Sequence, residues 1–364
     1  MASKVYFAEA GGRPRQGPLD RLHMLFEAAG FPARITKRDL VAVKVHVGER
    51  GSTSFVPPYY VSAIVEDVTR CGGRPFLTDS GCLYFSARYN ARDHMVVAAE
   101  HGFTIETAGA PFLVADGLRG SDVRTVEVNF KNLTSVDVVS AIHDANSLVV
   151  VTHVTGHALT GFAGTLKNLG MGAAGRRMKL AVHDQVRPGV NHDLCTVCKN
   201  CLDNCPAEAV DIVDGQIVMD PDVCIGCGEC ISICPEKAVG VLWKGDPLAA
   251  QEKLAEISAA VLANKRDRCC FFTFLINITP TCDCWNYSAA PLVGDIGYLA
   301  SSDPVAIDQA AADLVNGAGG PGDGPGATDR FRASFHSIDW SRQLSYAEEI
   351  GLGTRSYELE RIGD

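Results

Sequence analysis

Two cysteine runs of the same design constrain this chain more than any other feature. Residues 195–206 read CTVCKNCLDNCP, and residues 224–235 read CIGCGECISICP. Each run follows C-x2-C-x2-C-x3-C-P, the spacing that holds bacterial-type [4Fe-4S] clusters, and the fourth cysteine of such a run ligates the other cluster. The runs therefore predict two clusters with crossed ligands, one held by Cys195, Cys198, Cys201 and Cys234, and the other by Cys224, Cys227, Cys230 and Cys205.

The link between the two runs contains a hairpin signal. Apolar residues alternate on either side of Val213-Asp214-Gly215, and Asp-Gly is a preferred pair in tight hairpin turns. Zinc is the alternative occupant, because C-x2-C pairs also bind zinc. Zinc knuckles, however, lack the third cysteine at this spacing and the proline after the fourth. The segment from 187 to 244 therefore resembles a two-cluster ferredoxin inserted into a larger domain.

Strand and helix patterns alternate on both sides of the cysteine runs. Such alternation indicates an α/β fold with a mostly parallel sheet and helices on both faces. Residues 1–186 and 245–364 would form this discontinuous host domain, and residues 187–244 an inserted small α+β bacterial-type ferredoxin domain. The predicted strands are 40–47, 74–80, 147–154 and 270–278, and the predicted helices are 57–73, 90–102, 247–264 and 304–316.

The composition excludes several classes of function. The chain has 364 residues, a net charge of -10 and a pI near 5.5, so it lacks the basic character of a nucleic-acid binder. No apolar run approaches the about 20 residues that span a bilayer, and the first residues do not resemble a signal peptide. A cytoplasmic location is therefore expected, where 14 cysteines indicate metal binding or redox chemistry rather than disulfides.

Chemically useful side chains gather in the loops that follow the predicted strands. In open α/β sheets, ligands bind outside the carboxyl ends of the strands. We therefore expect a cleft there that mixes cations, imidazoles and a carboxylate and suits an anionic substrate or a metal. The candidates for catalysis are His153, His157, Lys167 and Asp295, and those for binding a cofactor are Lys44, His46 and Asn168.

Several polar and glycine residues of these loops also have structural interpretations. Asp303, which precedes a proline and an alanine-rich helix, is interpreted as an N-cap. Lys167 would lie in the last turn of a short helix closed by Gly170, where a cation suits the helix dipole. Gly170, Gly172 and Gly175 would either bring the backbone close to a phosphate or only turn a corner. The basic run RRMK at 176–179 is expected in solvent.

Six of the 14 cysteines lie outside the two runs. Cys71 and Cys82 are expected to behave as small apolar residues. Cys269 and Cys270 begin a predicted strand and are expected in the core or at a strand edge. A strand rises about 3.3 Å per residue, so this pair cannot join the cysteines beyond the strand's end in one site unless the chain bends sharply.

The remaining pair lies in TCDCW at 281–285, where Cys282 and Cys284 are one residue apart. A disulfide across so short a ring would be strained and easily reduced, which suits a redox-active dithiol. Two thiolates with Asp283, or with a histidine of the 153–157 loop, would instead hold a metal or a third cluster. In the structural interpretation, two thiols in a turn shield a cluster while Trp285 excludes water. The sequence leaves all three open.

Together these segments resemble the DUF362 family, uncharacterised proteins of which many carry a two-cluster ferredoxin segment inside the host domain. The resemblance covers nearly the whole chain. It implies an iron–sulfur protein of anaerobic or low-potential metabolism that acts in electron transfer or as an oxidoreductase component. The residues that carry it are KVHVG, GGRPFLTDS, HVTGH…GFAGTLKNLGMG, the two cysteine runs and TCDCW…GDIGYLASSDPVAIDQA.

Three functions fit these observations. The first is an iron–sulfur oxidoreductase that passes low-potential electrons through two [4Fe-4S] clusters to a substrate or a redox-active dithiol at the host cleft. The second is a non-catalytic electron-transfer subunit of a larger redox complex, and the third is a metal-dependent enzyme with structural clusters. The expected partners are a redox protein and a small anionic substrate.

The sequence says less about further cofactors. It has no Walker loop and no clear G-x-G-x-x-G after a strand, so nicotinamide binding is not supported. A flavin or a further metal is compatible with the sequence, which specifies neither the substrate nor the oligomeric state.

Overall fold

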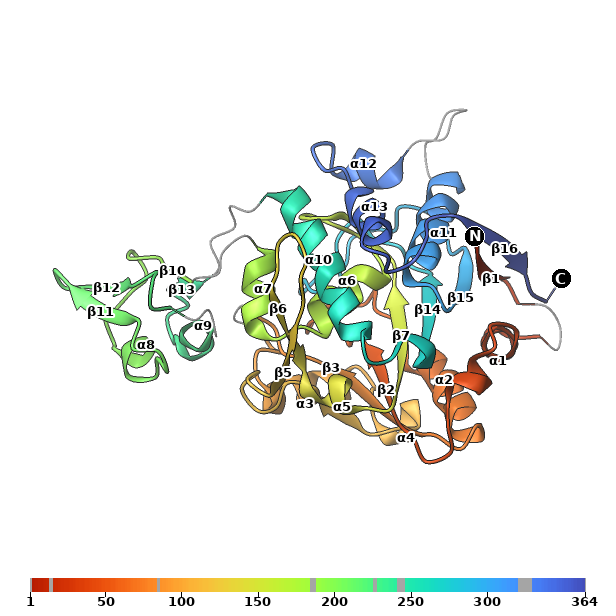
Figure 1. Ribbon diagram of the computed structural model, residues 1–364, viewed down its shortest axis with the longest axis horizontal. Coiled ribbons are helices and arrows are strands. Elements are labelled where there is room, and N and C mark those ends of the chain that lie inside the picture. Colours follow the sequence, from red (N-terminus) through yellow and green to blue (C-terminus); the bar gives the residue numbers. More distant parts are fainter. Residues whose placement is uncertain are drawn as a thin grey trace.

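Within the residues that the structure describes, the central element is an eight-stranded sheet (Figure 1). The structure is a computed structural model that describes residues 2–12, 16–83, 86–183, 188–224, 228–240, 246–319 and 329–363. The strand order is β16-β1-β15-β14-β7-β2-β3-β4. These strands are β1 (Ser3–Glu9), β2 (Leu40–Val45), β3 (Arg74–Asp79), β4 (Phe112–Val114), β7 (Ser147–His153), β14 (Cys269–Leu275), β15 (Gly297–Ser301) and β16 (Tyr357–Arg361).

The sheet is mostly parallel, as predicted. β14, β7, β2, β3 and β4 run parallel to one another, while β15 pairs antiparallel with both β14 and β1. β16 pairs parallel with β1 at the edge of the sheet. Its sequence YELER is largely exposed and charged, which is typical of an edge strand and carries little strand signal.

Two hydrophobic cores cover the two faces of the sheet. In β7, Leu148 and Val150 belong to one core, whereas Val149 and Val151 belong to the other, because successive side chains of a strand point to opposite faces. The first core also takes residues from α5 (Ser140–Asp144), α6 (Thr165–Gly172), α7 (Arg176–Val182), α10 (Pro247–Leu262), α11 (Pro304–Gly317), α12 (Arg330–Ser334) and α13 (Arg342–Glu349). The second takes residues from α1 (Pro18–Ala28), α2 (Pro58–Arg70), α3 (Ala91–Glu100) and α4 (Ile105–Ala108).

The ends of the predicted helices have local causes. α2 begins at Pro58, whose missing N–H costs nothing in the first turn. Asp303 caps α11, as interpreted from the sequence, because its carboxylate accepts hydrogen bonds from Val305 N at 2.9 Å and Ala306 N at 3.0 Å. No helix among the described residues is long and apolar enough to cross a membrane.

Two antiparallel pairs accompany the sheet without joining it. β5 (Val123–Glu127) pairs with β6 (Ser135–Val139), and β8 (Thr155–His157) pairs with β9 (Gly161–Ala163). The second pair occupies the loop after β7 that the sequence predicts to carry two site histidines. That loop therefore has a fixed backbone, which leads directly into α6.

The cysteine-rich segment, residues 188–224 and 228–240, adds no described strand to the central sheet and lies beside it in Figure 1. β11 and β12 form the predicted hairpin, with positive φ at Asp214 (51°) and Gly215 (78°) as a type I′ turn requires. Whether the segment is a separate ferredoxin domain stays a prediction. Its described elements are β10 (Gly189–Val190), α8 (Asn200–Asp203), β11 (Val210–Val213), β12 (Gln216–Met219), α9 (Glu229–Ile233) and β13 (Val239–Gly240).

An approximate two-fold repeat relates the two halves of the cysteine-rich segment. The cysteine runs begin 29 residues apart, at Cys195 and Cys224, and the same offset relates backbone contacts around them. The first strand of each half pairs with the last strand of the other half. The matched contacts are the register pairs Val190–Val239 and Met219–Val210 and the backbone hydrogen bonds Asn191–Ala238 and Asp220–Ala209.

Candidate functional site

A network of buried polar side chains lies at the carboxyl ends of β2 and β3. Asp79, the last residue of β3, lies 2.9 Å from Lys44 Nζ through Oδ1 and 3.0 Å from His46 Nδ1 through Oδ2. Burial would raise the pKa of the Asp79 carboxyl, but Lys44 and then His46 lower it well below its usual value. Asp79 therefore acts as the anionic centre of this network.

Lys44 and Asn168 connect β2 with α6. Lys44 is 1% exposed, and its Nζ donates to Asn168 Oδ1 at 2.7 Å. Gly172 leaves room for this lysine, because a Cβ at that position would collide with Lys44 Cε and Nζ. Gly170 faces Leu254 of α10 in the same way. Both glycines thus lie within α6 and permit close packing, so the helix is not closed at Gly170.

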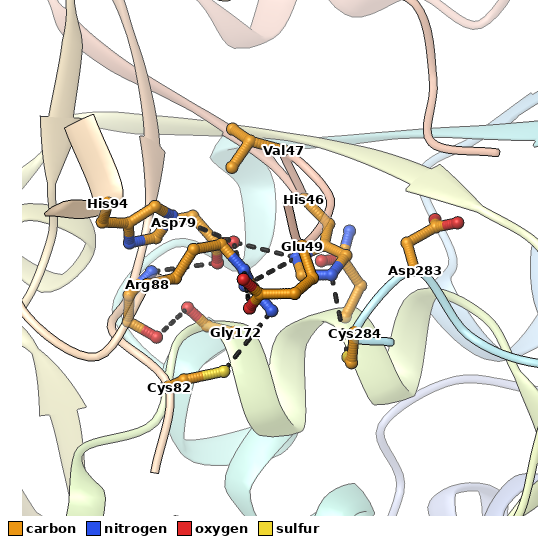
Figure 2. A network of polar contacts seen from close by, with 12 residues as sticks. His46, Val47, Glu49, Asp79, Cys82, Arg88, His94, Gly172, Asp283 and Cys284 are labelled. Carbon is orange, nitrogen blue, oxygen red and sulfur yellow. Dashed lines mark hydrogen bonds and ion pairs between the residues drawn. The ribbon is translucent and has the colours of Figure 1, made fainter. Parts of the chain in front are cut away.

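Arg88 joins this network from the loop between β3 and α3. Its Nε lies 3.2 Å from Glu49 Oε2, its Nη1 lies 3.5 Å from His46 Nδ1, and its Nη2 donates to Cys82 Sγ at 3.4 Å. Figure 2 shows these contacts continuing through His46 to Cys284. Cys82 is buried as expected, but it contacts a guanidinium group, so it is not simply an apolar residue.

Cys284 is the sulfur that this network reaches. Cys284 Sγ lies 3.4 Å from Lys167 Nζ and 3.7 Å from His46 Nε2. A hydrogen bond from the Cys282 thiol lowers the pKa of Cys284 well below its usual value against the effect of burial, and Lys167 and His46 lower it further. The same hydrogen bond, together with burial, raises the pKa of Cys282. These contacts favour a thiolate on Cys284 and a proton on Cys282.

Lys167 occupies the first turn of α6, not the last turn as the sequence predicts. α6 begins at Thr165, whose backbone N–H donates to Asp308 Oδ1 at 2.6 Å, and Leu166 N donates to Asp308 Oδ2 at 2.9 Å. A cation gains nothing from the helix dipole at this end. Burial would lower the pKa of Lys167, but Cys284 raises it above its usual value.

His153 and Asp283 form a buried pair rather than a metal-binding set. His153 Nδ1 lies 2.7 Å from Asp283 Oδ2, and His153 Nε2 lies 2.8 Å from Ile276 O. Burial lowers the pKa of His153, but Asp283 raises it overall, so both ring nitrogens donate. Asp283 Oδ1 accepts from Ser54 Oγ at 2.6 Å. Asp283 therefore braces the turn between the two cysteines, and its oxygens are engaged within the protein.

The two remaining predicted residues have different surroundings. His157 Nδ1 accepts hydrogen bonds from Leu159 N at 3.2 Å and Thr160 N at 3.3 Å. Burial lowers its pKa to about 3, with Lys167 adding to the effect, so the imidazole is neutral. Asp295 is exposed and accepts from Asn277 N at 2.6 Å, which places it with the loop after β14 and not in the network around Asp79.

The cysteines of the two runs approach one another crosswise. Burial raises the pKa of Cys201, and Cys234 and Cys195 lie close enough to raise it further. A separate hollow is lined by the three cysteines Cys205, Cys224 and Cys230. Cys227 lies outside the described residues, and among those described, no three His, Cys, Asp or Glu side chains converge on a single metal-ion position.

The family model described as "Domain of unknown function (DUF362)" matches residues 41–313. The chain belongs to this family. No curated protein matches it. Two solved structures resemble it distantly, and it spans little more than half the length of each.

The first of these structures is the lactate racemase apoprotein from Thermoanaerobacterium thermosaccharolyticum, with 10% identity, a TM-score of 0.41, and coverage of 83% of this chain and 57% of that chain. The second is a Thermotoga maritima protein from a structural genomics programme, with 10% identity, a TM-score of 0.37, and coverage of 72% and 52%.

Several residues of this DUF362 site were not predicted from the sequence. Asp79 lies in the segment GGRPFLTDS that carries the family resemblance, and its place at a strand's carboxyl end could have identified it. Arg88 and Glu49 come from loops without a motif. His94 is fully buried 3.9 Å from Asp79 Oδ2, and burial lowers its pKa to about 3. Only the fold brings these side chains together.

Proposed function

We propose that this DUF362 protein is an iron–sulfur thiol–disulfide oxidoreductase in which Cys282 and Cys284 form the catalytic pair. The observation that carries the proposal is the setting of Cys284, whose sulfur has a thiol, an ammonium and an imidazole as neighbours. The thiolate, not the thiol, attacks a disulfide. These contacts therefore select Cys284 as the attacking sulfur.

His46 and Asp79 support this assignment by their geometry. Asp79 Oδ2 holds His46 Nδ1 at 3.0 Å, which directs His46 Nε2 toward Cys284 Sγ. Burial and Arg88 lower the pKa of His46, but Cys284 and Asp79 raise it overall. A nucleophile, a neighbouring base and a third group that orients the base are typical of an activated catalytic side chain. The imidazole would stabilise the thiolate before the attack.

The proposed reaction balances with the groups present. The Cys284 thiolate attacks one sulfur of the substrate disulfide, so the substrate S–S bond breaks and one substrate thiolate leaves. Cys282 then attacks the mixed disulfide, forms the Cys282–Cys284 disulfide and releases the second substrate thiolate, which takes the proton of Cys282. Two electrons and one proton from a low-potential donor return the pair to one thiol and one thiolate.

The crossed cysteines support the two [4Fe-4S] clusters of this proposal. Cys234 approaches the first run, while Cys205 shares a hollow with Cys224 and Cys230. A cubane cluster binds one thiolate at each iron, so its ligands need not converge on one point. Bound clusters would supply electrons one at a time.

The position of the cysteine-rich segment also favours a redox role. Leu83 belongs to the same apolar cluster as Cys201 and Cys234, and its neighbour Cys82 contacts Arg88. Since Arg88 also lies near His46, the loop after β3 touches both the cysteine-rich segment and the dithiol site.

The two alternatives explain less of the geometry. In a non-catalytic electron-transfer subunit, a buried thiolate with a matched lysine would have no role. Burying such charges is costly unless they are compensated, so the pair indicates a chemical function. The metal site suggested by the sequence would use Asp283 or a histidine of the 153–157 loop together with the two thiolates. Asp283 is already bonded to His153 and Ser54.

The test measures disulfide reduction by the cluster-containing protein under anaerobic conditions. Reduced viologen supplies electrons, and a chromogenic aromatic disulfide is the substrate. Replacing Cys284 or Cys282 with serine should lower the rate by about a hundredfold or more, as the loss of a nucleophile does. Cys71→Ser, which changes a partly buried cysteine far along the chain, is the matched control. Unchanged rates in both serine variants, with intact cluster spectra, would overturn the proposal.

A further inference from the structure

The His46 ring lies between a buried carboxylate and the sulfur of Cys284 (Figure 2). Its Nδ1 lies 3.0 Å from Asp79 Oδ2, and its Nε2 lies 3.7 Å from Cys284 Sγ. The Asp79 side chain is 3% exposed, whereas that of His46 is 22% exposed. Because Nδ1 faces the buried carboxylate, the exposed part of the ring lies away from Nδ1. A disulfide bound at Cys284 Sγ would therefore lie within reach of Nε2.

Asp79 determines which ring nitrogen of His46 can lose a proton. Although burial would raise the pKa of Asp79, Lys44 and then His46 hold it well below its usual value, so the carboxylate keeps accepting from Nδ1–H. Arg88 Nη1 lies 3.5 Å from the same nitrogen and adds a fixed positive charge that disfavours the imidazolium. A proton that leaves His46 therefore leaves from Nε2, on the side of the reacting sulfur.

The attack on a disulfide removes the charge that holds this proton. Burial and Arg88 lower the pKa of His46, while Cys284 and then Asp79 raise it overall. Once Cys284 Sγ is bonded to a substrate sulfur it is neutral, so of these four influences only Asp79 still favours the imidazolium. His46 thus becomes a stronger acid at the step that releases a substrate thiolate.

Three other nitrogen groups near Cys284 are poorer acids for this step. Burial lowers the pKa of His157 to about 3 and that of His183 to about 4, so neither ring has a proton to give at neutral pH. Lys167 Nζ lies 3.4 Å from Cys284 Sγ, but an ammonium group ordinarily has a pKa about four units above that of an imidazolium. A general acid works best when its pKa is near the working pH, which favours His46.

We infer that His46 gives its Nε2 proton to the first substrate thiolate that Cys284 displaces, which makes unactivated alkyl disulfides the substrate class of this site. Alkyl thiolates leave slowly because their thiols have a high pKa, whereas aromatic thiolates leave readily. This inference rests on the proposed function. The substrate S–S bond breaks, the bond from Cys284 to the substrate forms, and the proton moves from His46 to the departing sulfur. A proton from solvent restores the imidazolium when the cysteine pair is reduced again.

The test compares two uncharged disulfides in a single turnover. Reduced, cluster-containing protein is mixed anaerobically with a nitrophenyl disulfide or a hydroxyethyl disulfide, and the first equivalent of released thiol is quantified after an acid quench. His46→Gln keeps a hydrogen-bond donor near Cys284 but has no proton to give. It should slow the reaction of the hydroxyethyl disulfide about a hundredfold more than that of the nitrophenyl disulfide, as the loss of a general acid does.

His23→Gln is the matched control, because His23 Nδ1 lies 2.8 Å from the buried Asp67 Oδ1 and its side chain is 27% exposed. Its ratio of the two rates should equal that of the wild type. Equal slowing of both disulfides by His46→Gln would overturn the inference and leave the cysteine pair as the catalytic site. A larger loss specific to the alkyl disulfide in Lys167→Met would also overturn it, because the ammonium would then be the acid. If the wild type reduces neither disulfide, the proposed function fails as well.

Discussion

Cysteines occur in two contrasting settings in this protein. In the cysteine-rich segment, the predicted ligands recur at short, regular spacing along the chain. In the α/β body, the chemistry of Cys284 depends on Lys167, which is 117 positions away in sequence, and on His46, which is 238 positions away. The spacing of the cysteines is therefore enough to predict the first setting from the sequence. The surroundings of Cys284, in contrast, form only when folding brings distant residues together. The two settings should respond differently to mutation.

The largest effect of a substitution, the loss of a whole cluster, is expected in the cysteine-rich segment. Replacing Cys205 with serine should remove the cluster predicted on the other run, because the fourth cysteine of each run crosses over. The iron content should fall from about eight to about four per chain. The residual electron paramagnetic resonance spectrum should match that of Cys224→Ser and differ from that of Cys195→Ser. A match with Cys195→Ser would contradict crossed ligation.

The next effect concerns Lys167 in the α/β body. Replacing it with methionine removes the ammonium group 3.4 Å from Cys284 Sγ, so the pKa of Cys284 should rise. At a pH below the apparent pKa of Cys284, the rate of Cys284 alkylation should fall about tenfold, which corresponds to a rise of about one pKa unit. Lys4→Met, at an exposed ion pair with Glu360, is the control and should leave the rate unchanged. Equal rates in both variants would show that Lys167 does not stabilise the thiolate.

A smaller effect is expected on stability. Gly172→Ala should force Lys44 out of its place between β2 and α6 and lower the free energy of unfolding by about 1–3 kcal/mol, as overpacking does. Gly11→Ala is the matched control, because a Cβ there meets no atom within 4 Å. Denaturant unfolding of both variants under anaerobic conditions measures the difference. If Gly172→Ala is as stable as Gly11→Ala, Lys44 has more freedom than its contacts indicate.

The smallest effect concerns the pH dependence of the cap of α6. Burial raises the pKa of Asp308 to about 7 from the ordinary value of 3.8. A carboxyl with a raised folded pKa contributes stability that is full below its unfolded pKa and is lost as pH rises through its folded pKa. Wild-type stability relative to Asp308→Asn should therefore fall between about pH 4 and about pH 7 and then level off. If the stability of the wild type relative to Asp308→Asn increases with pH over this range, the predicted loss of stability is contradicted.

The sequence predictions were accurate for features that depend on interactions between residues close together in the chain. The cap at Asp303, the hairpin at Asp214-Gly215 and the doubly covered strand at 147–153 depend on neighbouring residues, and their positions were predicted within a residue or two. Cys269 and Cys270 were expected in the core or at a strand edge, and they lie in the two cores on opposite faces of β14.

The predictions that were wrong concern long-range partners. α6 starts where Asp308 caps it, 143 positions away in sequence, so the turn that carries Lys167 was misplaced. Arg177 of the RRMK run pairs with Asp137, which no local pattern indicates. Asp295 lies between β14 and β15, and its carboxylate accepts a hydrogen bond from Asn277 N. The sequence could not show whether this carboxylate makes that contact or faces the site.

The most direct test of the central claim measures which sulfur of the Cys282–Cys284 pair carries the thiolate. The reduced, cluster-containing protein is alkylated anaerobically over a range of pH, and each cysteine is quantified by mass spectrometry. Cys284 should react with an apparent pKa well below that of an ordinary thiol, about 8.5, while Cys282 stays unreactive over the same range. Equal titration of both cysteines at or above the ordinary thiol pKa would contradict a catalytic thiolate at this site.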